Sequence, residues 1–189
     1  MFKSTGIFVS LFLMAALGPT SFPKAAAGPS GGCIAYGDDY AFALAPPKGW
    51  VLSCDANEHS DVPVALWRTG STWANAKVVM YINPSKRGSP PQTLDDFVQF
   101  SASQFRKDKP GVKISPGEPL QTGDHSRVVV QHFTGDQWGN HEAVAYIESK
   151  TIFAIVVLSS RTEAEYKTSY PAFEKLVSSY MFMNKTEAK

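Results

Sequence analysis

The order of hydrophobic periodicities along the chain limits most strongly the folds that it can adopt. Period-two segments predict strands over residues 40–44, 50–52, 64–67 and 77–82, and a second block of strands is expected over 126–133, 141–147 and 151–159. A helix is expected after each block, from Thr93 to Lys109 and from Ser160 to Tyr180, because apolar residues there recur at intervals of three and four. Short hairpin connections favour an α+β domain in which a mostly antiparallel sheet is flanked by two main helices.

Several local signals refine this prediction. The segment from Thr151 to Ser159 is almost continuously apolar, which is typical of a central strand buried on both faces. Thr93 and Ser160 each precede an acidic residue by three positions and are expected to cap the two helices. Pro171 is expected to kink the second helix or to split it in two.

Residues 1–27 resemble a cleavable export signal. Lys3 supplies a positive charge, the apolar run from Ile7 to Leu17 is too short to span a bilayer, and Ala25–Ala27 offer small residues for a signal peptidase. We therefore expect an exported protein, periplasmic or secreted from a bacterium. The alternative of a lipoprotein is disfavoured, because no apolar residue stands three positions before Cys33.

The rest of the chain divides simply. We expect a flexible, glycine-rich mature N-terminus over residues 28–35, a single domain over 36–183 and a polar tail over 184–189. The 18 basic side chains lose Lys3 and Lys24 with the leader, which leaves 16 against 17 acidic ones. A near-neutral chain lacks the broad positive field that binding to nucleic acid or to an anionic membrane usually requires, and no later apolar run is long enough to span a membrane. We expect a monomer.

The two cysteines, Cys33 and Cys54, are expected to form a disulfide in an oxidising compartment. Such a bond would stabilise the domain by about 3 kcal/mol through the unfolded state. A metal or redox pair is the alternative, but it requires closer spacing or further ligands nearby.

Three short motifs carry a resemblance to a known family. Pro47-Lys48-Gly49-Trp50 follows an early strand, Thr93 to Phe97 opens the first helix with the sequence TLDDF, and Ser178-Ser179-Tyr180 ends the second. This pattern resembles the PsbP-like superfamily, which includes PsbP and bacterial DcrB-like exported proteins, over roughly residues 36–183. The resemblance implies an α/β/α sandwich and an accessory or binding role without known catalysis.

The segment between residues 126 and 147 contains two of the four histidines, His132 and His141. If its turn is centred between Asp136 and Gln137, the two imidazoles face each other with Cβ atoms about 5 Å apart. With a nearby carboxylate, Asp136 or Glu142, they could bind zinc or a similar divalent ion. A turn shifted by one residue separates them, and then they are two ordinary hairpin histidines.

Trp73 and Trp138 lie in turns rich in small polar residues. A large indole there either folds back on the edge of the core or stands out as an anchor for a partner. Our first hypothesis is a non-catalytic accessory or binding protein at the cell envelope, with no cofactor and with an envelope protein or small ligand as partner. The alternative is a small envelope hydrolase or metal-dependent enzyme that uses His132 and His141.

Overall fold

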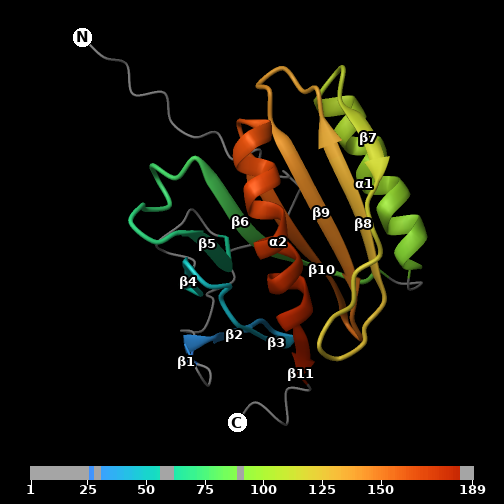
Figure 1. Ribbon diagram of the computed structural model, residues 1–189. Coiled ribbons are helices and arrows are strands. Elements are labelled where there is room, and N and C mark those ends of the chain that lie inside the picture. The colour runs from blue at the N-terminus through green and yellow to red at the C-terminus, as the bar shows by residue number, and fades with distance from the viewer. Residues whose placement is uncertain (1–25, 28–30, 56–61, 89–91, 184–189) are drawn as a thin grey trace.

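The computed structural model describes residues 26–27, 31–55, 62–88 and 92–183 (Figure 1). Residues 1–25 of the expected signal peptide and the expected tail, 184–189, lie outside these ranges, so both assignments stay predictions. Within the described ranges, neither helix combines the length and the apolar character that crossing a bilayer requires.

Within these described ranges the structure has two helices and eleven strands. The helices are α1 (Leu94–Asp108) and α2 (Glu163–Ser179). The strands are β1 (Ala26–Ala27), β2 (Cys33–Tyr36), β3 (Ala41–Leu44), β4 (Trp50–Ser53), β5 (Val64–Arg68), β6 (Val78–Lys86), β7 (Lys113–Pro116), β8 (Val128–Thr134), β9 (His141–Glu148), β10 (Ile152–Ser160) and β11 (Met181–Met183).

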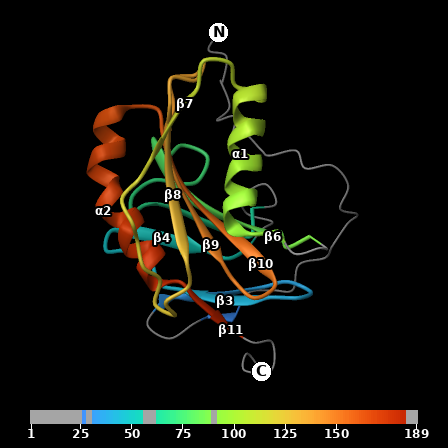
Figure 2. The ribbon, with the colours of Figure 1, turned by 90° about the vertical axis from the view of Figure 1, so that its right-hand side faces the viewer.

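The larger sheet has seven strands in the order β4-β5-β6-β10-β9-β8-β7, and every neighbouring pair is antiparallel. Helix α2 covers one face of this sheet and α1 covers the other (Figure 1). A smaller sheet, β1-β2-β3-β11, lies at one end, where Figure 2 shows β3 and β11 below the larger sheet. The predicted α+β class with an antiparallel sheet between two helices is confirmed.

Strand β10 shows why the sheet needs a helix on each face. Ile152 and Leu158 point to the core beneath α2, whereas Phe153 and Val157 point to the core beneath α1. All four side chains are buried, as are most residues of the strand. The apolar run that begins near Thr151 therefore forms a central strand, as predicted, because both of its faces are removed from water.

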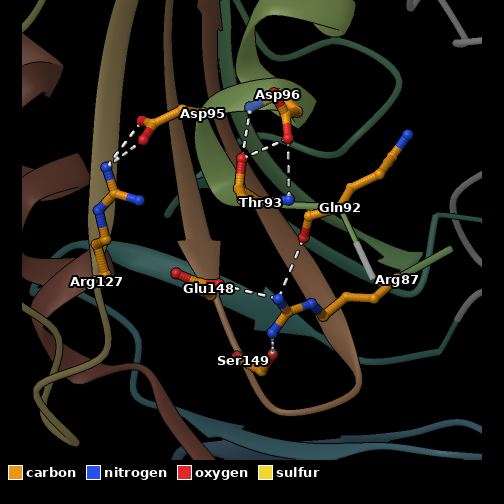
Figure 3. Close-up of polar contacts among 8 residues, drawn as sticks. All are labelled: Arg87, Gln92, Thr93, Asp95, Asp96, Arg127, Glu148 and Ser149. Carbon is orange, nitrogen blue, oxygen red and sulfur yellow. Dashed lines mark hydrogen bonds and ion pairs between the residues drawn. The ribbon is translucent and has the colours of Figure 1, made fainter. Parts of the chain in front are cut away.

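The predicted cap of α1 is confirmed. The Thr93 hydroxyl accepts a hydrogen bond from the Asp96 backbone N–H at 3.1 Å, and the Asp96 carboxylate accepts one from the Thr93 N–H at 3.4 Å (Figure 3). These two bonds form a reciprocal capping box.

The start of α2 differs from the prediction. Ser160 is the last residue of β10, and Thr162 caps the helix by accepting a hydrogen bond from the Glu165 N–H at 3.2 Å. The helix also runs through Pro171 without a break. Pro171 is exposed, and its ring deprives only the exposed Lys167 of a helical donor to its carbonyl, so water can replace that bond.

The predicted disulfide between Cys33 and Cys54 is present, with the two Cα atoms 6.4 Å apart. Cys33 begins β2 in the smaller sheet, and Cys54 follows β4 at the edge of the larger one, so the bond joins the two sheets. Residues 33–35, which the sequence assigned to the flexible N-terminus, belong to β2. Cleavage after Ala27 would remove β1 and leave three strands in the smaller sheet.

Candidate functional site

The β8–β9 hairpin carries the residues that sequence reasoning singled out, and its two faces differ in chemistry. His132 and His141 lie on the face covered by α2, while Glu142 lies on the face covered by α1. Trp138 stands in the turn between the strands. The hairpin therefore brings together the two histidines, Glu142 and Trp138.

The register of the hairpin separates the two histidines. His132 pairs with Ala143, so the turn is shifted by one residue from the position that would place His132 opposite His141. Both imidazoles instead lie near Tyr166 of α2, with ring centroids 6.2 Å and 6.1 Å from the tyrosine ring. Of the two registers that the sequence left open, the hairpin has the shifted one, because turn geometry rather than residue spacing sets the register.

His132 makes a specific contact with α2. Its Nδ1 lies 2.5 Å from the Tyr166 hydroxyl, and burial lowers the pKa of His132 while it raises the pKa of Tyr166. Both shifts favour the neutral forms, in which the tyrosine donates to Nδ1 and the proton of the imidazole sits on Nε2. A Cβ added at Gly117 would lie 2.9 Å from Nε2, so the backbone of residue 117 covers this second nitrogen.

This geometry offers little to a metal ion. One nitrogen of His132 is bonded to a tyrosine and the other faces Gly117. Across the part of the chain that the structure describes, no group of three or more His, Cys, Asp or Glu side chains is arranged to hold a metal. The expected carboxylate, Glu142, points to the opposite face of the sheet, toward Lys109.

On the α1 face, sequence reasoning missed a buried ionic cluster. The Lys109 Nζ lies 3.7 Å from a carboxylate oxygen of Asp136 and 3.7 Å from one of Glu142, and all three residues are buried. Glu142 also accepts a hydrogen bond from the Ser159 hydroxyl at 3.0 Å. Burial raises the pKa of Glu142, and the charge of Lys109 opposes that shift.

Arg106, Lys107 and Lys109 all stand at the C-terminal end of the helix, where the helix dipole favours cations. Lys109 differs in that it immediately precedes Pro110 and Gly111. It is the C-cap residue, and its side chain turns inward under the hairpin. Arg106 and Lys107 are therefore exposed, whereas Lys109 is only 4% exposed.

Asp136 fixes the tip of the hairpin. Its carboxylate accepts hydrogen bonds from the backbone N–H groups of Trp138, at 3.1 Å, and Asn140, at 2.8 Å, and from the Asn140 side-chain amide at 2.9 Å. Trp138 is held on this turn with 48% of its surface exposed, and the Lys109 Nζ lies 5.7 Å from its ring centroid. The indole is therefore both exposed and positioned.

Trp73 occupies a different environment. It is half-buried against the core beneath α1, and its ring meets the edge of Tyr81 at a centroid distance of 6.4 Å. Of the two tryptophans considered as anchors for a partner, Trp138 is therefore the more exposed.

Comparison with known proteins supports the fold. No protein-family model matches the chain, and no curated protein matches it in sequence. The solution structure of the cyanobacterial PsbP protein from Synechocystis sp. PCC 6803 superimposes with a TM-score of 0.51 at 13% sequence identity, over 90% of this chain and 99% of that one. A Pseudomonas aeruginosa protein of unknown function gives a TM-score of 0.45 at 12% identity, over 81% and 93% of the two chains. From the first of these similarities and the antiparallel sheet between two helices, we conclude that the chain has a PsbP-like α+β fold.

Proposed function

We propose that the mature chain is an exported, disulfide-linked PsbP-like accessory protein that works at the cell envelope as a monomer. In this proposal it binds a partner through the tip of the β8–β9 hairpin and performs no catalysis. Export is supported by the leader pattern of residues 1–27 and by the Cys33–Cys54 disulfide, a bond that persists in oxidising compartments.

The observation that carries the proposal is Trp138. A large indole that is 48% exposed on a turn held by three hydrogen bonds to Asp136 is pre-organised for contact. Ordering the tip before binding reduces the conformational entropy that association would otherwise remove. The other large apolar residues that are exposed among those described are Val51, Phe100 and Met181, which lie on other elements.

The alternative enzyme at His132 and His141 has weaker support. Both histidines contact Tyr166, but each is flanked by aromatic rings rather than by carboxylates within bonding distance. Glu118 is the acidic group that acts on His132, and it does so through its charge rather than through a hydrogen bond. These contacts join β8 to α2, and they lack the carboxylate partner that usually orients a metal-binding histidine.

Site-specific photo-crosslinking in the source cells tests the proposal. A photoreactive phenylalanine analogue replaces Trp138 in one variant and Val51, a 37% exposed residue of edge strand β4, in the control. We expect discrete adducts from position 138 in the envelope fraction and none from position 51. Equal labelling at both positions, or no adduct at position 138, would refute a contact role for the hairpin.

Native mass spectrometry with metal analysis tests the alternative. We expect the protein purified from its envelope fraction to carry no stoichiometric metal and to have the mass of the disulfide form. A bound metal that disappears in a His132→Ala/His141→Ala variant would instead establish the metal-dependent site.

A further inference from the structure

Exposed cations gather around the hairpin tip. The C-terminal end of α1, the start of β7, the β8–β9 turn and the junction of β10 with α2 all lie at the upper end of the molecule in Figures 1 and 2. We call the surface formed there the basic end; it consists of Trp138 together with Lys77, Arg106, Lys107, Lys113 and Arg161, all of them exposed.

Strand register places these residues at one end of the sheet. Val78 pairs with Ser160, so Lys77 and Arg161 are the next residues beyond that pair. Lys113 opens β7 beside the end of β8, and its Cγ would lie 3.8 Å from a Cβ added in the hairpin turn at Gly135. Residues far apart in sequence thus lie at the end of the sheet that carries Trp138.

These cations differ from those at the opposite end of α1. There, ion pairs join Lys86 to Asp39 at 2.8 Å, Arg87 to Glu148 at 3.1 Å and Arg127 to Asp95 at 2.8 Å, and Figure 3 shows the last two. None of the five cations of the basic end forms an ion pair with another residue that the structure describes. Their charge is therefore available to an external partner.

Acidic residues near this end cancel only part of that charge. Asp136 and Glu142 are buried and face Lys109, so they do not reach the surface. Glu163 is paired with Lys167 at 2.7 Å. Asp108 and Glu165 are the remaining acidic side chains there, against five cations, and the basic end carries a net positive charge.

We propose that the basic end binds an anionic phospholipid membrane surface, with Trp138 at the level of the headgroups and the cations against lipid phosphates. This inference rests on the proposed function, since it names the partner of the hairpin. The combination of an exposed tryptophan with lysine and arginine side chains is the one that lipid–water interfaces favour. The cations also come from separate elements and form a broad end, which suits an extended anionic surface.

Vesicle flotation tests the inference on the full mature chain. Vesicles of phosphatidylcholine containing about one third phosphatidylglycerol are compared with vesicles of phosphatidylcholine alone, at low ionic strength and at about 0.5 M salt. We expect binding to the anionic vesicles only, and loss of that binding at high salt.

Matched variants locate the contact. Lys113→Gln/Arg161→Gln removes two cations of the basic end, and Lys150→Gln/Lys175→Gln removes two exposed, unpaired lysines elsewhere among the described residues, with the same change in net charge. We expect the first pair to weaken partitioning about 25-fold, at roughly fivefold for each cation, and the second to change it less than about twofold. Trp138→Ala should weaken partitioning roughly tenfold.

Equal binding to both kinds of vesicle, no binding to either, or equal losses in the two double variants would overturn the lipid assignment. Thermal unfolding checks that each variant is folded. If vesicle binding fails while position 138 still crosslinks to an envelope protein, the lipid assignment falls and the proposed function stands. If crosslinking fails as well, both are refuted.

Discussion

Replacing Lys109 by methionine tests the buried ionic cluster most directly. The Lys109 side chain is 6% exposed, and its Nζ lies 3.7 Å from oxygens of Asp136 and Glu142, whose side chains are 4% and 7% exposed. At that separation each pair of unit charges attracts by about 4 kcal/mol at an effective dielectric constant of about 20. Removing one partner of a buried ion pair costs about 3–5 kcal/mol, because the remaining charges lose their compensation. We expect Lys109→Met to lower the free energy of unfolding by that amount.

The loss should depend on pH in a defined direction. Burial already raises the folded-state pKa of Glu142, and Lys109 opposes the rise, so the variant should raise that pKa further. A carboxyl whose folded pKa exceeds its unfolded value favours folding below the unfolded pKa and loses this contribution as pH rises through the folded pKa. The cost of Lys109→Met should therefore be smaller near pH 5 than near pH 7.

Urea unfolding followed by far-ultraviolet circular dichroism at both pH values measures these costs. Lys107→Met is the matched control, because Lys107 is an exposed neighbour, and it should change stability by less than about 0.5 kcal/mol. The double variant Lys109→Met/Glu142→Gln should be more stable than Lys109→Met alone. The reasoning fails if Lys109→Met costs no more than Lys107→Met, or if its cost is the same at both pH values.

Three further predictions concern the disulfide and the surroundings of His132. Replacing both Cys33 and Cys54 by serine should lower the free energy of unfolding by about 3 kcal/mol in a denaturant titration, and adding reductant should have no effect on that variant; an unchanged midpoint would contradict this. Gly117→Ala should cost about 1–3 kcal/mol, because its Cβ would lie 2.5 Å from Val130 Cγ1, and calorimetry showing wild-type stability would contradict the packing argument. Because the pKa of His132 is lowered in the folded state, this residue contributes stability above its ordinary pKa of about 6.5, which is lost as pH falls through the folded value. His132→Gln should reduce that acid-side loss, and superimposable stability profiles of variant and wild type would count against it.

Sequence reasoning singled out some residues of the candidate site, but it missed the buried cluster at Lys109 and did not settle how the histidines are arranged. Alternation along the hairpin was enough to single out His132 and His141, yet the turn sets the strand register, and the register places them around Tyr166 instead of opposite each other. Trp138 was recognised as a possible anchor from its place in a turn. Its position depends on Asp136, whose carboxylate accepts the hydrogen bonds that fix the turn. The spacing of apolar residues along the chain cannot predict such hydrogen bonds.

The sequence by itself determined the architecture of this protein. The spacing of apolar residues shows which face of each segment is buried in the core. It therefore predicted the central strand near Thr151, the helix capped by Thr93 and the antiparallel sheet between two helices. Cysteine count and compartment likewise predicted the disulfide.

Only the tertiary structure decided where the charges lie. Along the chain the basic and acidic residues nearly balance, which argued against a positive field. Folding buries Lys109 with two carboxylates and pairs the cations near the start of α1. At the end of the sheet that carries Trp138 it leaves five exposed cations that form no ion pair with any residue the structure describes. Electrostatic interactions depend on distance in space and on burial, and neither can be read from spacing along the chain.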